Sequence, residues 1–338
     1  MSERPALPHR ELRVAARLRR GWDWLARHTP RLIAGASLGA LAVGVAVSWP
    51  HLRAYSWDIT WWPLAVAALA YPPAQLLAAT LWGAILERSG GRASWRQHLK
   101  VYCASCLARR LPTPAWFIAG RLGMYRALGV GQRMTSVAMA LEVALIAFSG
   151  AVVSLAALLL PDSLVGLPAR YTPWLAGLAV ASLLLVARPT VLPRVMTAIG
   201  RRLGRQQQWD VTVDPGHMLL WAGGYALIWV LGGITLYCLT RALHPLPIAR
   251  LPHVIGIWAL AGTISQLAVF MPAGLGIREA SLVAMLSTLA PLPVVVVVAI
   301  VARLWYSILE LVFFALTSRL HLEEPLANES PSIAQMGD

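Results

Sequence analysis

The chain has 338 residues, of which 58% are hydrophobic and only 13% are charged. This composition excludes an ordinary soluble domain, and several apolar runs approach or exceed the roughly 20 residues that a helix needs to cross a bilayer. The net charge of +14 comes from arginines that cluster between the apolar runs, as positive-inside topology expects, so nucleic-acid binding is not needed to explain it. The sequence predicts an all-α polytopic membrane protein without a nucleic-acid partner.

In chain order, residues 1–30 form a basic, amphipathic segment that is predicted to be a cytoplasmic tail. The runs that can span a bilayer are 31–50, 62–85, 134–160, 172–188, 217–243 and 292–317. Connections rich in arginine alternate with connections poor in it, which places both termini in the cytoplasm. Residues 319–338 are polar and acidic, which predicts a disordered cytoplasmic tail, so the transmembrane domain is 31–318.

Two regions do not fit as simple spans. Residues 98–121 contain Pro112 and Pro114, and residues 255–290 contain Pro272, Gly274 and Gly276. The apolar pieces beside the first break are too short to cross a bilayer, and irregular backbone at membrane depth is tolerated only inside protein or along a cavity. Both regions are therefore predicted to be re-entrant helical hairpins. Two short full spans over 255–290 are the alternative.

The order of these elements predicts an internal repeat. Two spans, a hairpin and a span cover 31–160, and the same series covers 172–317. Each half then has an odd number of full spans, so the halves must be inverted relative to one another. Inverted repeats with broken helices are the architecture of many secondary transporters.

Charged residues occur where the chain is predicted to lie inside the membrane, and such charges usually mark a site. The candidate substrate-binding residues are Arg109, Arg110, Arg121, Glu142, Arg278, Glu279, Arg303 and Glu310. A shift of 160 residues, the separation of Pro112 and Pro272, maps Glu142 next to Arg303, which suggests an ion pair between the halves. The functional interpretation is a polar track for an anionic lipid headgroup, with Arg278 at the start of a helix holding a phosphate. The alternative is ion pairing that only joins the helices.

Other chemistries have weak support in the sequence. Cys103 and Cys106 form a CxxC without a second pair or a histidine cluster, so no metal or other cofactor is expected. No paired carboxylates or nucleophile with a base indicate an enzyme. A polyprenyl-phosphate-dependent membrane glycosyltransferase, or its non-catalytic membrane partner, is the alternative function, although the 51–61 loop offers only Asp58. Glycine pairs at 223–224 and 232–233 predict close helix packing.

The motifs LARRLPTPAWFIAGRLGMYRALGVG (107–131), ALEVAL (140–145) and MPAGLGIREASLVAML (271–286) resemble the transmembrane region of the lysylphosphatidylglycerol synthase family. The resemblance covers most of 31–317 and implies a flippase that moves a charged phospholipid or a polyprenyl-linked glycolipid between leaflets of the cytoplasmic membrane. Apart from the resemblance, a homodimer is one expected assembly. A stand-alone member without the aminoacyl-transferase domain is expected, so lysyl-lipid synthesis is not. Thr113 and Ala273 depart from the glycines usual in the family. The resemblance assigns site roles to Pro112, Arg121, Glu142, Pro272, Gly274, Gly276 and Glu279.

Overall fold

The computed structural model describes residues 55–108, 114–158, 214–267 and 277–319, with the single positions 49, 53, 160 and 177. The described residues form helices and no strand. The helices are α2 (Trp62–Arg88), α3 (Trp95–Ala108), α4 (Pro114–Ala127), α5 (Gln132–Leu158), α8 (Pro215–Leu243), η2 (Ile248–Arg250), α9 (Leu251–Leu267), α10 (Ile277–Leu286) and α11 (Leu292–Ser318). The expected all-helical class is confirmed over this part of the chain.

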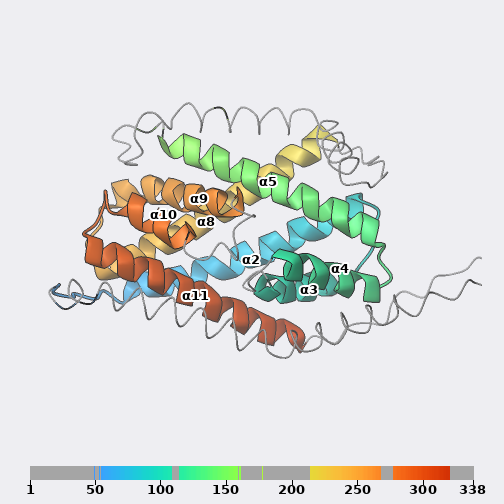
Figure 1. The fold of residues 1–338 in the computed structure, drawn as a ribbon, viewed down its shortest axis with the longest axis horizontal. Helices are drawn as coiled ribbons and strands as arrows, with labels where there is room; N and C mark the ends of the chain where they lie inside the picture. Colours follow the sequence, from blue (N-terminus) through green and yellow to red (C-terminus); the bar gives the residue numbers. More distant parts are fainter. Residues whose placement is uncertain are drawn as a thin grey trace, which may run out of the picture.

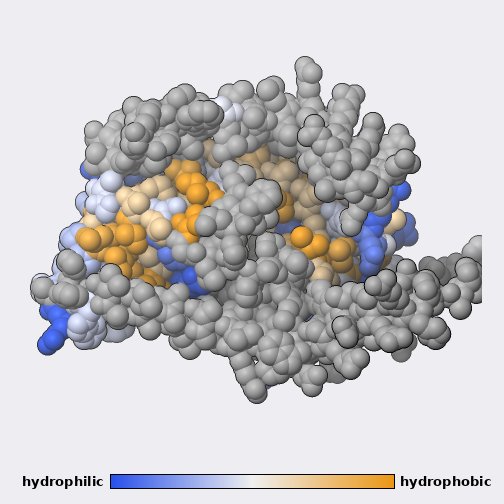
Figure 2. Space-filling view, in the orientation of Figure 1, coloured by the Kyte–Doolittle hydropathy of each residue, from blue (hydrophilic) through white to orange (hydrophobic). Residues whose placement is uncertain are grey.

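Five of these helices are long and apolar enough to cross a membrane: Trp62–Arg88, Gln132–Ala157, Pro215–Leu243, Ile248–Gln266 and Leu292–Ser318. Four of them coincide with predicted spans. The predicted spans 31–50 and 172–188 lie outside the described residues, as do both terminal tails apart from Arg319. Large apolar side chains such as Leu69, Leu220 and Leu311 are exposed on these helices, as expected for lipid-facing positions. Figure 2 shows apolar side chains over the middle of the visible face and hydrophilic residues at its two ends. The protein is therefore an integral membrane protein.

The first broken region forms two short helices, as its prolines predict. α3 and α4 have 14 residues each, about 21 Å of helix, which is longer than the apolar pieces suggested but shorter than a bilayer core of about 30 Å. They are longer because each helix continues into the polar residues outside the apolar piece. The two helices of the second broken region differ in length. α10 has only 10 residues, whereas α9 with the 3₁₀ turn before it is a candidate span. Whether this pair is re-entrant therefore stays a prediction.

Helices α2 and α8 form an antiparallel pair along their whole length. The Thr60 amide donates to the Ala242 carbonyl at 2.9 Å at one end, and Arg88 Nη2 lies 2.7 Å from His217 Nε2 at the other. Asp214 caps the first turn of α8 by accepting from the Gly216 amide at 3.0 Å. Helices α5 and α11 lie on opposite sides of this pair, and the α3–α4 and α9–α10 pairs lie at opposite ends of the molecule (Figure 1).

Close packing between the long helices depends on glycine, as the glycine pairs predicted. A Cβ at Gly232 would lie 2.2 Å from the Trp258 ring, and one at Gly233 would lie 2.5 Å from the backbone of Ile255, both on α9. Gly224 is closed off by Leu81 of α2 in the same way, at 2.8 Å, whereas Gly223 has no atom within 4 Å. Three of the four predicted packing glycines are thus confirmed.

Candidate functional site

The first buried charge cluster joins α4 to α5. Arg121 Nη1 of α4 donates a hydrogen bond to Glu142 Oε2 of α5, and both side chains are 0% exposed. Ser105 Oγ of α3 accepts from Arg121 Nε at 3.1 Å and from Nη2 at 3.0 Å. The guanidinium group therefore holds the short pair α3–α4 against α5.

Aromatic rings enclose the Arg121 guanidinium on its remaining sides. Its Cζ atom lies 3.9 Å from the Trp82 ring centre, 4.7 Å from that of Phe117 and 5.1 Å from that of Tyr102. These distances are within cation–π range, and such contacts are strongest where water is excluded. The charge is thus matched by a carboxylate and by the faces of aromatic rings, which is how a buried arginine avoids a large desolvation cost.

A series of polar contacts runs from this cluster toward one end of the molecule. Trp82 Nε1 donates to the Tyr125 hydroxyl at 2.6 Å, and that hydroxyl lies 2.8 Å from His98 Nδ1. His98 Nε2 lies 3.6 Å from Glu87 Oε1 at the end of α2. His98 is 2% exposed, whereas the Glu87 side chain is 57% exposed. These contacts connect the exposed Glu87 carboxylate with the Trp82 ring, which lies against Arg121.

The second charge cluster joins α10 to α11. Arg303 Nη1 donates to Glu279 Oε1 at 2.6 Å, and these side chains are 22% and 27% exposed. Arg278 Cζ lies 3.9 Å above the Trp258 ring of α9, and that ring is stacked on Tyr306 with centroids 4.9 Å apart. The two clusters differ in exposure, because the first is sealed and the second is partly accessible.

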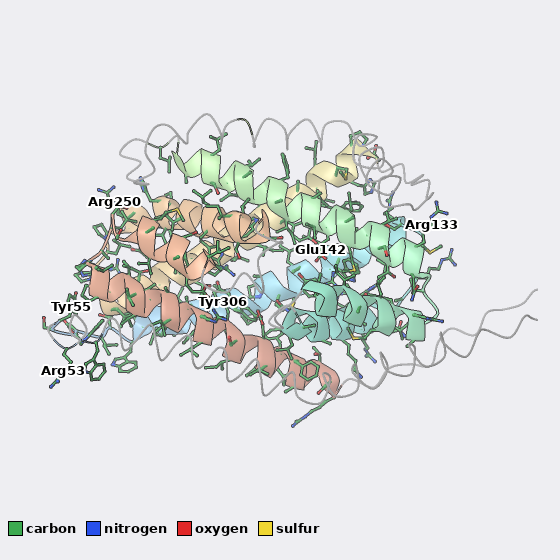
Figure 3. All side chains as sticks on the ribbon, in the orientation of Figure 1. Arg53, Tyr55, Arg133, Glu142, Arg250 and Tyr306 are labelled. Carbon is green, nitrogen blue, oxygen red and sulfur yellow. The ribbon has the colours of Figure 1, made fainter. Side chains whose placement is uncertain are left out.

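Polar and aromatic side chains lead from the second cluster to α3, the helix that carries Ser105 of the first cluster. Tyr306 meets Tyr71 of α2 edge to face, with centroids 5.7 Å apart, and the Tyr71 hydroxyl donates to Gln75 Oε1 at 3.4 Å. Gln75 Nε2 in turn donates to the sulfurs of Cys103 and Cys106 on α3, at 3.8 and 3.6 Å. Figure 3 places Glu142 and Tyr306 in the middle of the molecule, while the labelled arginines lie at its ends.

The predicted ion pair between Glu142 and Arg303 is wrong. Glu142 pairs with Arg121, and Arg303 pairs with Glu279. Each pair joins two neighbouring helices, because α4 packs on α5 and α10 packs on α11. The arginine lies on the shorter helix in the first pair and on the longer helix in the second.

The other predicted site residues have different outcomes. Arg278 lies in the second cluster beside Glu279, and Glu310 is half-buried on α11, two turns beyond Arg303. Pro114 begins α4. Arg109, Arg110, Pro112, Pro272, Gly274 and Gly276 lie outside the described residues.

Sequence reasoning missed the polar face of α3. His98, Tyr102 and Ser105 are spaced i, i+4 and i+7, so they share one face of the helix, and all three are buried. Polar residues at helical spacing inside a predicted membrane hairpin are the signal that could have found them. Trp258 and Tyr71 carry no such signal, because aromatic residues are common throughout the apolar runs.

Among the described residues, no group of three or more His, Cys, Asp or Glu side chains could hold a metal ion. No protein-family model matches the chain, and no curated protein matches it.

Proposed function

We propose that this protein is a lipid translocator that moves a charged headgroup across the bilayer between its two halves. The observation that carries the proposal is the presence of two Arg–Glu pairs at corresponding places of two similar helix series. Each pair joins the second short helix of a series to the long helix that follows. Charges at that depth are costly, so a pair in each half points to a path for a charged group.

The lengths of the helices support an inverted repeat. Helices α5 and α11 have 27 residues each and are separated by 160 positions, since 132 + 160 is 292 and 158 + 160 is 318. Each follows a pair of shorter helices, and each pair follows a long helix. The halves thus share the series long, short, short, long.

The packing supports the same relation. In an inverted repeat, a twofold axis in the membrane plane makes equivalent helices antiparallel where they meet. α2 and α8 form such an antiparallel pair at the centre. α5 packs on α9, and its counterpart α11 packs on α3, the counterpart of α9. This reciprocal contact is what the axis requires.

The distribution of basic residues supports an orientation. One end of the molecule, where α2 ends and α3, α5 and α8 begin, carries Arg88, Arg92, Arg96, Lys100, Arg126 and Arg133. The opposite end carries Arg53, Arg241 and Arg250. By the positive-inside rule, the first end faces the cytoplasm. The α3–α4 pair then enters from the cytoplasmic side and the α9–α10 pair from the outside.

The chemistry of the clusters fits a headgroup with a phosphate. Guanidinium groups bind phosphate through two parallel hydrogen bonds, and Arg278 and Arg303 lie in the more accessible cluster. Glu279 balances Arg303 when no lipid is bound, and it can accept hydrogen bonds from a cationic or hydroxylated headgroup. The acyl chains stay in lipid throughout. A cavity between the two breaks stays a prediction, because residues 109–113 and 268–276 lie outside the described residues.

The test uses the purified protein in vesicles that contain a fluorescent phospholipid with an anionic headgroup. The measurement is the rate at which the headgroup becomes accessible to a membrane-impermeant quencher. Arg278→Ala should reduce this rate at least tenfold, and Arg278→Lys should restore little, because an ammonium group does not replace the planar fork. Arg126→Ala is the matched control, since Arg126 is exposed at the end of α4. Equal rates in all three variants and the wild type would refute the assignment of Arg278.

A further inference from the structure

The buried histidine beside the first charge cluster has no role in headgroup binding. His98 is 2% exposed, and its ring packs directly on α2, where a Cβ at Gly83 would lie 3.0 Å from it. A larger residue at position 83 would force the ring to shift by a few tenths of an ångström. The ring connects three helices, because Glu87 belongs to α2, His98 to α3 and Tyr125 to α4.

The hydrogen bonds around His98 fix its neutral tautomer. The Tyr125 oxygen already accepts from Trp82 Nε1, and Tyr125 is 0% exposed, so its own proton needs an acceptor. His98 Nδ1, at 2.8 Å, is that acceptor. Nε2 then carries the ring proton and directs it toward the Glu87 carboxylate at 3.6 Å. In this arrangement the Trp82 and Tyr125 donors have acceptors, while the Nε2 proton faces the Glu87 carboxylate at ion-pair distance without a hydrogen bond.

A second proton on His98 is incompatible with this arrangement. It can bind only at Nδ1, which then becomes a donor toward the Tyr125 oxygen. The Tyr125 proton loses its acceptor, and a buried unsatisfied donor is costly. The hydrogen bond that holds Tyr125 between His98 and Trp82 therefore has to rearrange. Because the Trp82 ring lies against Arg121, the rearrangement reaches the ion pair that holds α4 on α5.

We propose that His98 is the proton-binding site that couples translocation to protonation from the cytoplasmic end. This inference rests on the proposed function. In the neutral state, the chain from Glu87 to Trp82 keeps Arg121 paired with Glu142 and the α3–α4 pair closed. Protonation of His98 adds a positive charge to α3, reverses the hydrogen bond with Tyr125 so that the Tyr125 proton loses its acceptor, and releases α4 from α5. Arg121 can then exchange Glu142 for the phosphate of a headgroup.

Charged groups around His98 change how readily its ring binds a proton. Glu87 of α2 favours the protonated ring, while Arg121 of α4 opposes it. The remaining groups are Arg96 and Lys100 on α3 itself, Tyr125 on α4, and Glu310 of α11, which acts on Cys103 five residues further along α3. The only carboxylate within 4 Å of the ring, among the described residues, is that of Glu87 at the exposed end. A proton therefore approaches from that side.

The experiment measures the transport rate in vesicles from pH 5.5 to pH 8, with the same pH on both sides. The wild-type rate should fall roughly tenfold per pH unit above the midpoint of the His98 titration, because one proton is required. His98→Gln accepts the Tyr125 bond but cannot be charged, so its rate should stay low at every pH. His217→Gln, at an exposed histidine at the same end, should keep the wild-type profile.

Two further variants separate proton binding from a structural role. Tyr125→Phe removes the bond that only neutral His98 can accept, so the midpoint should move to higher pH by about 0.5 to 1 pH unit. Glu87→Gln removes the favourable carboxylate, so the midpoint should move to lower pH. If His98 had only a structural role, Tyr125→Phe and Glu87→Gln would lower the transport rate without shifting the pH midpoint of transport. A profile in His98→Gln equal to that of the wild type would overturn the inference.

Hydrogen exchange of residues 114–127 in the same vesicles provides a readout that does not depend on transport. After correction for the intrinsic pH dependence, exchange in α4 should accelerate below the His98 midpoint in the wild type and not in His98→Gln. If no lipid is transported but the hydrogen exchange of α4 still accelerates below the His98 midpoint, only the proposed function fails. If lipid moves and α4 exchange is independent of His98, only the inference about His98 fails.

Discussion

Removal of the Glu142 charge should destabilise the protein more than any other single loss of a carboxylate in the described structure. In Glu142→Gln, Arg121 stays buried and charged, and its neighbours Ser105, the amide oxygen at position 142 and the surrounding rings carry no negative charge to balance it. Breaking a buried ion pair from one side costs about 3–5 kcal/mol in globular proteins. Both side chains are 0% exposed, so no water is available to replace the carboxylate.

The second ion pair provides a matched comparison. Glu279→Gln breaks a pair whose side chains are 22% and 27% exposed, and the cost of leaving one charge unpaired falls as its burial decreases. The free energy of unfolding should therefore fall several times more for Glu142→Gln than for Glu279→Gln. Arg126→Ala, which removes an exposed arginine from α4, should change it by less than about 0.5 kcal/mol.

The assay is reversible unfolding in mixed micelles, followed by circular dichroism, with hydrogen exchange of α4 as a local readout. A double variant, Arg121→Met with Glu142→Leu, replaces the pair by apolar groups of similar volume and should recover most of the lost stability. It should still fail to transport. If Glu142→Gln and Glu279→Gln lose the same small free energy, the reasoning that burial determines the strength of the first pair is refuted.

Three other predictions follow from packing, topology and charge. Gly256→Ala places a methyl group 2.3 Å from the Cβ of Ala157 on α5, so overpacking should lower the free energy of unfolding by about 1–3 kcal/mol. Gly223→Ala, which has open space around it, should be neutral or slightly stabilising in the same unfolding assay. In a cysteine-free background, Asp58→Cys should react with an impermeant maleimide from outside and Arg92→Cys only after permeabilisation; the reverse pattern would contradict the orientation. The pKa of the Asp214 carboxyl lies below its ordinary value because the histidine three residues later hydrogen-bonds to it. Its stabilising effect on the start of α8 is therefore present above about pH 4 and lost as the pH falls through the lowered pKa, so Asp214→Asn should remove this part of the fall in Tm between pH 5 and pH 3.

The sequence by itself determined four of the five candidate membrane helices that the structure describes. The spans at 62–88, 132–157, 215–243 and 292–318 follow from the length of their apolar runs, because a helix satisfies its own backbone groups inside a bilayer, whereas the span at 248–266 was not predicted. The end of α3 at Ala108 and the start of α4 at Pro114 agree with the prolines of this region, because proline cannot continue a helix from its interior. The sequence also identified Arg121, Glu142, Glu279 and Arg303 as charges inside the membrane, since a charge within an apolar run needs no tertiary information to be recognised.

Only the tertiary structure decided which of these charges meet. Repeat spacing placed Glu142 beside Arg303, but the pairing depends on the rotation of each helix about its axis and on which helices pack together. Helices α5 and α11 lie on opposite sides of the α2–α8 pair, so Glu142 and Arg303 face different neighbours and cannot meet. The length of α9, the seal around Arg121 and the contact of His98 with Tyr125 depend on the same helix packing, which no run of adjacent residues encodes.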